Sequence, residues 1–256
     1  MSEQRQQPIV TAADGSFEAE ARSLAERLGV PYETSVPEDA TVLRLGPDGL
    51  ALCAGTYELR ADLTHMLPRL TQRNLATEML VRAAKVRGDR SKMFAVDATA
   101  GFGEDALLLA AAGFQVRLYE RNPYIAALLA DALRRAKEEP LLAGVVERME
   151  LVCGDSIREL PGMTPAPDVI LLDPMFPERT KSAAVRKKFQ LIHRLEEPCA
   201  DEEELLAAAM AAHPRRIVIK RPVKGGYLAG VKPSFSMSGK AVRYDGIVPA
   251  ERKEPQ

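Results

Sequence analysis

The 256-residue sequence has no tryptophan, only three histidines and only three cysteines. The cysteines Cys53, Cys153 and Cys199 lie far apart without a C-x-x-C pair, which argues against a disulfide framework and against a zinc site. No uninterrupted apolar stretch approaches about 18 residues, and the first ten residues lack the apolar segment of a signal peptide. We therefore expect a cytoplasmic protein with no metal and no membrane segment.

The sequence also lacks an excess of charge of either sign. Lysine and arginine total 35 against 36 for aspartate and glutamate, a formal net charge of -1. Any attraction to nucleic acid must therefore come from a local basic patch. A hydrophobic fraction of 46% and a charged fraction of 28% are ordinary for a soluble globular protein, and the length allows one large domain with a small appendage.

Residues 1–70 are predicted to form a small N-terminal α+β domain. "QQPIVTAA" is typical of a short strand, and "SFEAEARSLAERLGV" has helical spacing with Ser16 as its N-cap and Gly29 just beyond its end. "TVLRLGPDGLALCAGTYELRAD" predicts two strands joined by a tight turn. "LPRLTQRNLATEMLVRAAKVRG" then predicts one connecting helix, and residues 71–256 are predicted to form the second, larger domain.

From Phe94 onward, short apolar strands alternate with longer helical segments. This alternation predicts an α/β fold in which a parallel sheet is covered by helices on both faces. "GKAVRYDGIV" is a strand with no helix after it, so we expect it to add to the sheet in the antiparallel direction. The predicted strands are "MFAVD", "FQVRLYE", "MELVCGD", "DVILLD", "RRIVIK" and this last one.

A glycine loop follows the first of these strands in "VDATAGFGEDA". Gly101-x-Gly103-x-x-Ala106 formally satisfies the dinucleotide fingerprint, with Glu120 at the end of the next strand as a ribose ligand. However, Asp97 precedes the glycines, where its charge would repel a pyrophosphate. S-adenosylmethionine has no phosphate and carries a sulfonium and an ammonium group, so it suits an acidic pocket better. The alternative without a ligand is a tight turn that needs glycine for packing.

Acidic residues stand at the predicted carboxyl ends of four successive strands, and in a parallel sheet these ends meet at one edge. They are Asp97, Glu120, Asp155 and Asp173. Asp155 and Ser156 are candidates to bind an adenine amine, although both residue types are also ordinary helix N-caps. Glu104 and Asp105 open a predicted helix, where they could equally complement its dipole. Together the acidic strand ends predict a pocket for a methyl donor.

"LLDPMFPER" closes the fourth strand and is similar to the [DN]-P-P-[YFW] motif of methyltransferases that act on exocyclic or amide nitrogens. An aromatic amine is a poor nucleophile. Hydrogen bonds to the Asp173 carboxylate and the Pro174 carbonyl would orient it and stabilise the positive charge that develops during transfer. Phe176 offers a face on which a flipped base can stack.

"VDATAGFGEDALLLAAAGFQVRLYERNPYIAALL", "LLDPMFPERTKSA" and "VIKRP…GK.VRYD" together resemble the ribosomal RNA small subunit methyltransferase J family. The resemblance implies a Rossmann-like class I methyltransferase fold with a seven-stranded, mostly parallel sheet. It also implies S-adenosylmethionine as methyl donor, S-adenosylhomocysteine as product, and exocyclic N2 of a guanosine near the 3′ end of 16S ribosomal RNA as acceptor. The donor-site residues implied by the match are Glu104, Asp105, Glu120, Arg121, Asp155, Ser156 and Asp173, in addition to Asp97 and Gly101 from the glycine loop.

Two basic groups flank the predicted acceptor pocket and could position an RNA strand by neutralising phosphates. The first comprises Arg179, Lys181, Arg186, Lys187, Lys188 and Arg194, and the second comprises Lys220, Arg221, Lys224, Lys232 and Lys240. The alternative without RNA binding is that these residues belong to a solvated helix and a lysine-rich loop.

Three other functions remain open from the residues alone. A methyltransferase of the same fold could act on adenine N6, a protein amide or a small molecule. An NAD-binding oxidoreductase would use the glycine loop for a dinucleotide. A non-catalytic RNA-binding module would bind no methyl donor.

Overall fold

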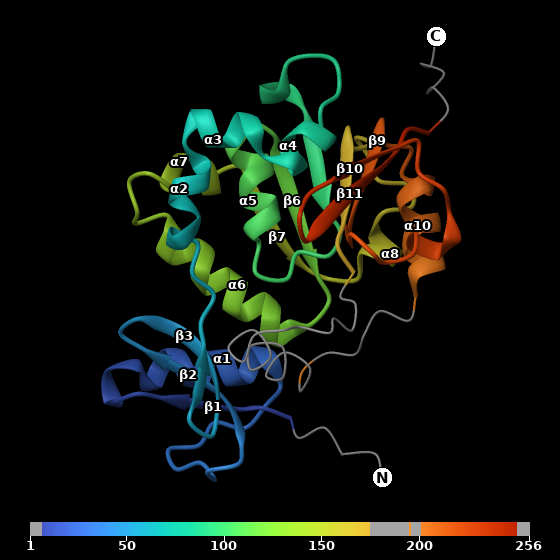
Figure 1. Ribbon diagram of the computed structural model, residues 1–256. Coiled ribbons are helices and arrows are strands. Elements are labelled where there is room, and N and C mark those ends of the chain that lie inside the picture. Colours follow the sequence, from blue (N-terminus) through green and yellow to red (C-terminus); the bar gives the residue numbers. More distant parts are fainter. Residues whose placement is uncertain (1–6, 175–194, 196–200, 250–256) are drawn as a thin grey trace.

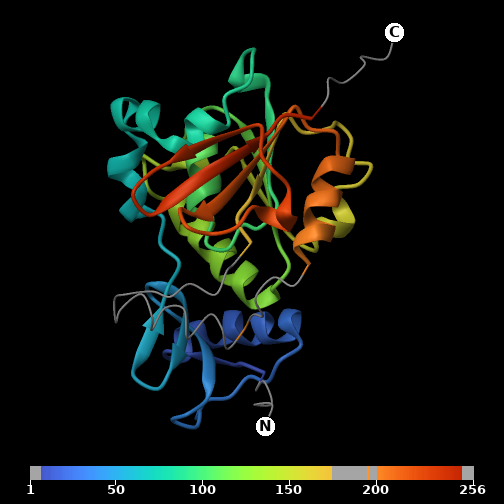
Figure 2. The ribbon, with the colours of Figure 1, turned by 45° about the vertical axis from the view of Figure 1, so that its right-hand side comes forward.

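A computed structural model gives the structure of the chain and describes residues 7–174, 195 and 201–249. These residues form two sheets, one of four strands and one of seven. In Figures 1 and 2 the small N-terminal sheet lies at the bottom of the molecule, and the larger sheet with its helices lies above it.

The small sheet has the strand order β1-β2-β3-β4. Its strands are β1 (Ile9–Ala12), β2 (Thr41–Gly46), β3 (Gly49–Ala54) and β4 (Tyr57–Leu59). Helix α1 (Glu18–Leu28) packs beside β1 and ends at Gly29, whose φ of 65° is the left-handed conformation expected of a helix-ending glycine. The predicted cap at Ser16 is wrong, because Ser16 lies inside a short 3-10 turn whose N-cap is Asp14.

The connecting segment is broken into three short helices where the sequence predicted one. They are α2 (Leu67–Leu70), α3 (Gln72–Thr77) and α4 (Met79–Ala83). Thr71 and Glu78 leave the helical conformation, with ψ of 142° and 126°. The Thr71 hydroxyl caps the next helix at Asn74, and the Glu78 carboxylate accepts two hydrogen bonds from Arg69, at 2.7 and 2.8 Å. These side-chain bonds stabilise the two breaks.

The seven-stranded sheet has the order β10-β11-β9-β8-β5-β6-β7. Strands β5 to β9 are parallel, and β11 and β10 add in the antiparallel direction, as expected for the last strand. The hairpin partner β10 was not predicted. The strands are β5 (Phe94–Asp97), β6 (Gln115–Glu120), β7 (Met149–Cys153), β8 (Val169–Leu172), β9 (Arg216–Pro222), β10 (Phe235–Ser238) and β11 (Val242–Ile247).

Helices cover both faces of this sheet because its central strands are apolar on both sides. In β8, Val169 and Leu171 belong to one core cluster, while Ile170 and Leu172 belong to the other. The first cluster includes side chains of α5 and α6, and the second includes side chains of α10. The helices are α5 (Glu104–Ala111), α6 (Pro123–Ala136), α7 (Ala143–Val146), α8 (Ser156–Glu159) and α10 (Glu202–Ala211). The predicted fold class is confirmed.

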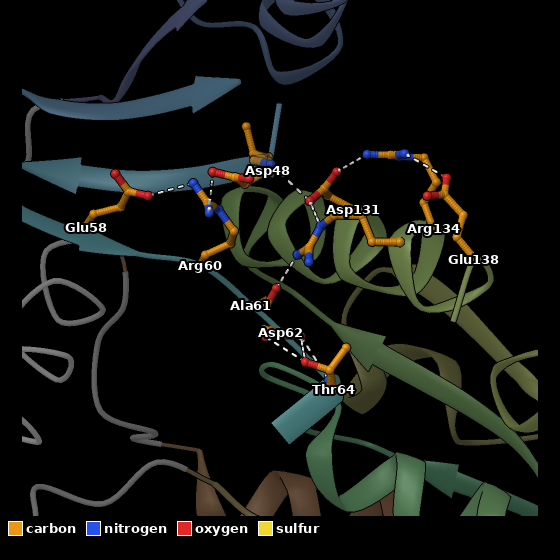
Figure 3. Close-up of polar contacts among 11 residues, drawn as sticks. Asp48, Glu58, Arg60, Ala61, Asp62, Thr64, Asp131, Arg134 and Glu138 are labelled. Carbon is orange, nitrogen blue, oxygen red and sulfur yellow. Dashed lines mark hydrogen bonds and ion pairs between the residues drawn. The ribbon is translucent and has the colours of Figure 1, made fainter. Parts of the chain in front are cut away.

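The small sheet is fixed to helix α6 by a buried carboxylate (Figure 3). Asp131 Oδ2 accepts hydrogen bonds from the Leu50 N–H at 2.9 Å and from Arg135 Nε at 2.8 Å. Arg135 also donates to the Ala61 carbonyl. One hydrophobic cluster includes residues of both sheets and does not separate them into two cores. The division into domains at residues 1–70 and 71–256 therefore stays a prediction.

Candidate active site

The chain changes direction across the sheet between β5 and β8. It first runs from β5 through β6 to β7, and then returns to β8 on the other side of β5. In open parallel sheets a ligand binds beyond the carboxyl ends of the strands at such a switch point. The loop after β5 and the residues after β8 are therefore the first place to look for a site.

The glycine loop after β5 is held by a carboxylate from the neighbouring strand. Glu120 is buried, and its two oxygens accept hydrogen bonds from the Gly101 N–H at 2.9 Å and the Asn122 N–H at 2.8 Å. A Cβ at Gly101 would meet no atom within 4 Å, whereas one at Gly103 would lie 2.8 Å from Leu129 Cδ1. Gly101 thus borders open space, as a ligand cradle requires, and Gly103 permits close packing of the loop on α6.

Asp173 follows β8 and is positioned by its backbone and its side chain. Its N–H donates to the Thr99 hydroxyl at 2.7 Å, which ties the end of β8 to the loop after β5. Its Oδ2 lies 2.9 Å from Lys220 Nζ, and the same ammonium lies 2.6 Å from Asp105 Oδ2. Asp105, Asp173 and Lys220 therefore form one charged cluster at the switch point.

Asp97 lies beside this cluster and is only 2% exposed. Burial raises the pKa of its carboxyl to about 8, the nearby charges of Asp105 and Asp173 add to the rise, and the Thr99 N–H and Lys220 oppose it. Burial also raises the pKa of the Tyr244 phenol, on the neighbouring strand β11, and Asp105 adds to that rise. With two carboxylates, Asp105 and Asp173, against the one ammonium of Lys220, this cluster has a net negative charge and suits a cationic ligand.

The remaining predicted donor-site residues follow the ends of β5, β6 and β7, and Ser156 among them is buried. Glu104 Oε1 is 3.5 Å from His65 Nε2, and exposed Arg121 pairs with Asp201 at 3.3 Å. Asp155 acts as a helix N-cap, since its side chain accepts a hydrogen bond from the Ile157 N–H at 3.1 Å. The cap is the alternative already recognised from the sequence, and the adenine contact stays a prediction.

Two residues that position the site, Thr99 and Lys220, were not predicted as site residues from the sequence. Thr99 anchors Asp173, and Lys220, grouped with the RNA-facing basic residues, has its ammonium between two pocket carboxylates. Arg221 likewise is 6% exposed and donates to the Gly226 carbonyl, so it is no surface phosphate contact. No pattern in the sequence of β9 (Arg216–Pro222) distinguishes Arg221 from its neighbour Lys220, because both are basic residues that follow an apolar run.

The predicted acceptor-site and RNA-binding residues are only partly within the described residues. Pro174 is buried directly after Asp173. Phe176 and the whole first basic group, from Arg179 to Arg194, lie outside the described residues. Lys224, Lys232 and Lys240 of the second group are exposed.

Other kinds of site are not found in the described part of the chain. Within residues 7–174, 195 and 201–249, no group of three histidine, cysteine, aspartate or glutamate side chains could hold a metal ion. No helix among these same residues has the length and apolar character needed to cross a membrane.

A strand order with a terminal antiparallel hairpin and acidic residues around a glycine loop is that of class I S-adenosylmethionine-dependent methyltransferases. Comparison with known proteins agrees. A family described as "Putative SAM-dependent methyltransferase" matches residues 26–248. A solved SAM-dependent methyltransferase of Neisseria gonorrhoeae superposes with a TM-score of 0.74 at 26% identity, covering 96% of this chain and 98% of that one.

Curated relatives narrow the class to one family. A protein of Alkalilimnicola ehrlichii named "Ribosomal RNA small subunit methyltransferase J" is 42% identical over 247 residues, which covers 91% of this chain and 92% of the relative. A protein of the same name from Pseudomonas paraeruginosa is 38% identical and covers 92% of each chain. The chain belongs to the ribosomal RNA small subunit methyltransferase J family, as its motifs predicted, and is an S-adenosylmethionine-dependent methyltransferase.

Proposed function

We propose that the protein transfers a methyl group from S-adenosylmethionine to the exocyclic N2 of a guanosine in 16S ribosomal RNA. The observation that carries this proposal is the position of Asp173 at the switch point, where its carboxylate pairs with Lys220 and its backbone N–H donates to the Thr99 hydroxyl beside the glycine loop. The relatives' name supports small-subunit ribosomal RNA as substrate. Since that substrate is made and assembled in the cytoplasm, we place the protein there.

The pocket fits the methyl donor by the chemistry of its side chains. Gly101 borders open space, and Glu120 holds the loop so that the donor can lie against its backbone. Asp97, Glu104, Asp105, Arg121, Asp155, Ser156 and Asp173 complete the proposed donor site. When bound, S-adenosylmethionine supplies an electrophilic methyl group on a positively charged sulfur.

The acceptor amine is activated by orientation. Its N–H groups donate to the Asp173 carboxylate and the Pro174 carbonyl, which aligns the nitrogen with the methyl group and stabilises the developing positive charge. Phe176 stacks on the flipped base. The exposed Lys224, Lys232 and Lys240, with the first basic group, bind phosphates of the RNA strand.

The decisive experiment is methylation of 16S ribosomal RNA, free and in small-subunit particles, followed by nucleoside analysis of the product. N2-methylguanosine is the expected product. N6-methyladenosine would move the proposal to another amine, and no RNA methylation at all would favour a protein or small-molecule acceptor. Titration with NAD beside S-adenosylmethionine tests the oxidoreductase alternative, and binding of neither ligand would favour the non-catalytic RNA-binding module.

The role of Asp173 is tested by one substitution. Asp173→Ala should lower kcat by about 100-fold or more, because the variant lacks the acceptor for the amine hydrogens. Binding of S-adenosylmethionine, measured by calorimetry, should remain. Full activity of Asp173→Ala would remove the residue from the mechanism.

A further inference from the structure

We propose that Lys220 is a positioning residue of the methyl transfer, which keeps the Asp173 carboxylate ionised and aimed at the acceptor amine. This inference rests on the function proposed above for Asp173. It assigns Lys220 to the reaction centre, and not to the binding of RNA phosphates.

The sheet register brings Lys220 to this place. Strand β9 pairs with β8 so that Leu172 lies opposite Ile219, and the next residues along the two parallel strands are Asp173 and Lys220. On its other side, Lys220 lies opposite Tyr244 of β11. The ammonium then reaches Asp105 in the first turn of α5, at 2.6 Å, and Asp173, at 2.9 Å.

The side chains of this cluster are largely removed from water. The exposed fractions are 26% for Lys220, 13% for Asp105 and 35% for Asp173. Burial by itself lowers the pKa of Lys220, but the charges of Asp105 and Asp173 outweigh that effect and raise the pKa above its ordinary value. Lys220 therefore stays charged throughout the pH range in which an enzyme of this kind is assayed.

One ammonium holds together carboxylates that would otherwise repel. Asp105 and Asp173 converge on Lys220 from α5 and the end of β8, and burial raises the pKa of the neighbouring Asp97 to about 8, which favours its protonated form at neutral pH. Tyr244 faces the cluster from β11, and its pKa is raised by burial and by Asp105, so its phenol is uncharged at neutral pH.

The charges of two arginines, Arg69 and Arg221, also affect the titration of groups in this cluster. The charge of Arg69, on α2, acts on Asp105 and Tyr244, but its guanidinium is paired with Glu78. The charge of Arg221, on β9, acts on Asp173 while its guanidinium bonds Gly226 and Glu202. Lys220 contacts both Asp105 and Asp173, and its removal brings out the repulsion between these two carboxylates.

Like charges confined to one site make a carboxylate hold its proton to higher pH. A protonated Asp173 accepts hydrogen bonds from an amine poorly, so turnover would be lost on the acid side. Removal of Lys220 should therefore shift the acid limb of the pH profile of kcat to higher pH, measured at saturating RNA and S-adenosylmethionine. A residue that only contacts phosphate, or only supports the fold, would not move that limb.

The test compares Lys220→Met with Lys224→Met in methylation of 16S ribosomal RNA between about pH 3.5 and 9, a range that includes the ordinary pKa of an aspartate, about 3.9. Lys220→Met should lower kcat at neutral pH by about 10-fold or more and move the acid limb up by about one unit. Lys220→Arg, which keeps the charge, should restore the wild-type limb. Lys224→Met removes an equal charge from the neighbouring exposed loop, and should raise the KM for RNA with the acid limb in place.

A second variant tests the same idea with Lys220 intact. Asp105→Asn leaves the ammonium to Asp173 alone and should move the acid limb to lower pH at saturating S-adenosylmethionine. An unmoved limb in Asp105→Asn overturns the proposal even if Lys220→Met does not fold. A Lys220→Met variant that only raises the KM for RNA, as Lys224→Met does, overturns it as well. These results differ from a failure of the proposed function, in which the wild-type protein itself forms no N2-methylguanosine.

Discussion

Replacing Asp131 by alanine should weaken the attachment of the N-terminal sheet to helix α6 and lower the free energy of unfolding. The carboxylate is 8% exposed and accepts hydrogen bonds from the Leu50 N–H, Arg135 and Arg134. In Figure 3 the Asp131 side chain extends from α6 toward the strands of the small sheet. The variant leaves a buried N–H without an acceptor and a mostly buried guanidinium without its charge partner.

The expected loss follows from these contacts. Breaking a buried ion pair by removing one partner costs about 3–5 kcal/mol, and an orphaned buried donor alone costs about 1–3 kcal/mol. Arg135 keeps its bond to the Ala61 carbonyl, and its side chain is 22% exposed, so water relieves part of the cost. We expect Asp131→Ala to lower the free energy of unfolding by about 3 kcal/mol, or Tm by about 6–12 °C for a chain of this size.

Urea unfolding with Arg134→Ala as control measures this loss. Arg134 also contacts Asp131 but is 53% exposed, so its removal should cost less than about 1 kcal/mol. A double-mutant cycle of Asp131→Ala with Arg135→Ala should give a coupling energy of about 1 kcal/mol or more. The reasoning is refuted if Asp131→Ala costs no more than Arg134→Ala.

The same variant should show a defined pH dependence. Burial opposes ionisation of Asp131, but hydrogen bonds from Arg135, the Leu50 N–H and Arg134 outweigh it and hold the pKa of the carboxyl below its ordinary value. A depressed folded-state pKa stabilises the fold fully above the unfolded pKa of about 3.9, and this contribution is lost as pH falls through the folded value. The stability difference between wild type and Asp131→Ala should therefore be constant near neutral pH and shrink below about pH 4.

Three further outcomes are expected. Gly49→Ala should lower the free energy of unfolding by about 2 kcal/mol or more, because Gly49 has a φ of +95° and an added Cβ would collide with Asp131; urea curves that match wild type would contradict this. Asp97→Asn should have a higher Tm than the wild type above pH 8 and the same Tm near pH 4. The pKa of Asp97 is raised to about 8 in the folded state, so the wild-type protein loses stability progressively as pH rises from about 4. Equal Tm values of the two proteins at pH 9 would exclude a raised pKa of Asp97 in the folded state. Glu120→Gln should weaken binding of S-adenosylmethionine by about 10-fold in calorimetry, since the amide holds the Gly101 N–H less strongly than the carboxylate does; unchanged affinity would show that the loop needs no such support.

The alternation of strands and helices was determined by the sequence over short distances. Hydrophobic period and glycine positions are local properties, so the β5–α5–β6 unit, the antiparallel last strand and the glycine that ends α1 could be predicted from neighbouring residues. The family motifs likewise lie in continuous segments, which is why the methyl donor and the acidic strand ends could be predicted together.

Local pattern was insufficient where side-chain partners decide the conformation. The segment from Leu67 to Ala83 has helical periodicity throughout, yet Thr71 and Glu78 interrupt it. Glu78 reaches back to Arg69, nine residues away, and this bond cannot be read from helical spacing. Edge strand β10 was missed because its pairing with β11 is needed to define it.

The partners of Lys220 depend on long-range packing and could not be predicted from neighbouring residues. Asp105 is 115 residues away from it in the chain, and a basic residue in a lysine-rich segment is more simply interpreted as a phosphate contact. The register of β8 and β9 and the packing of α5 on the sheet place three charges within hydrogen-bond distance. The amino-acid sequence defines which charged groups are available, and the long-range pairing of β8 with β9 and the packing of α5 define which of them neutralise one another.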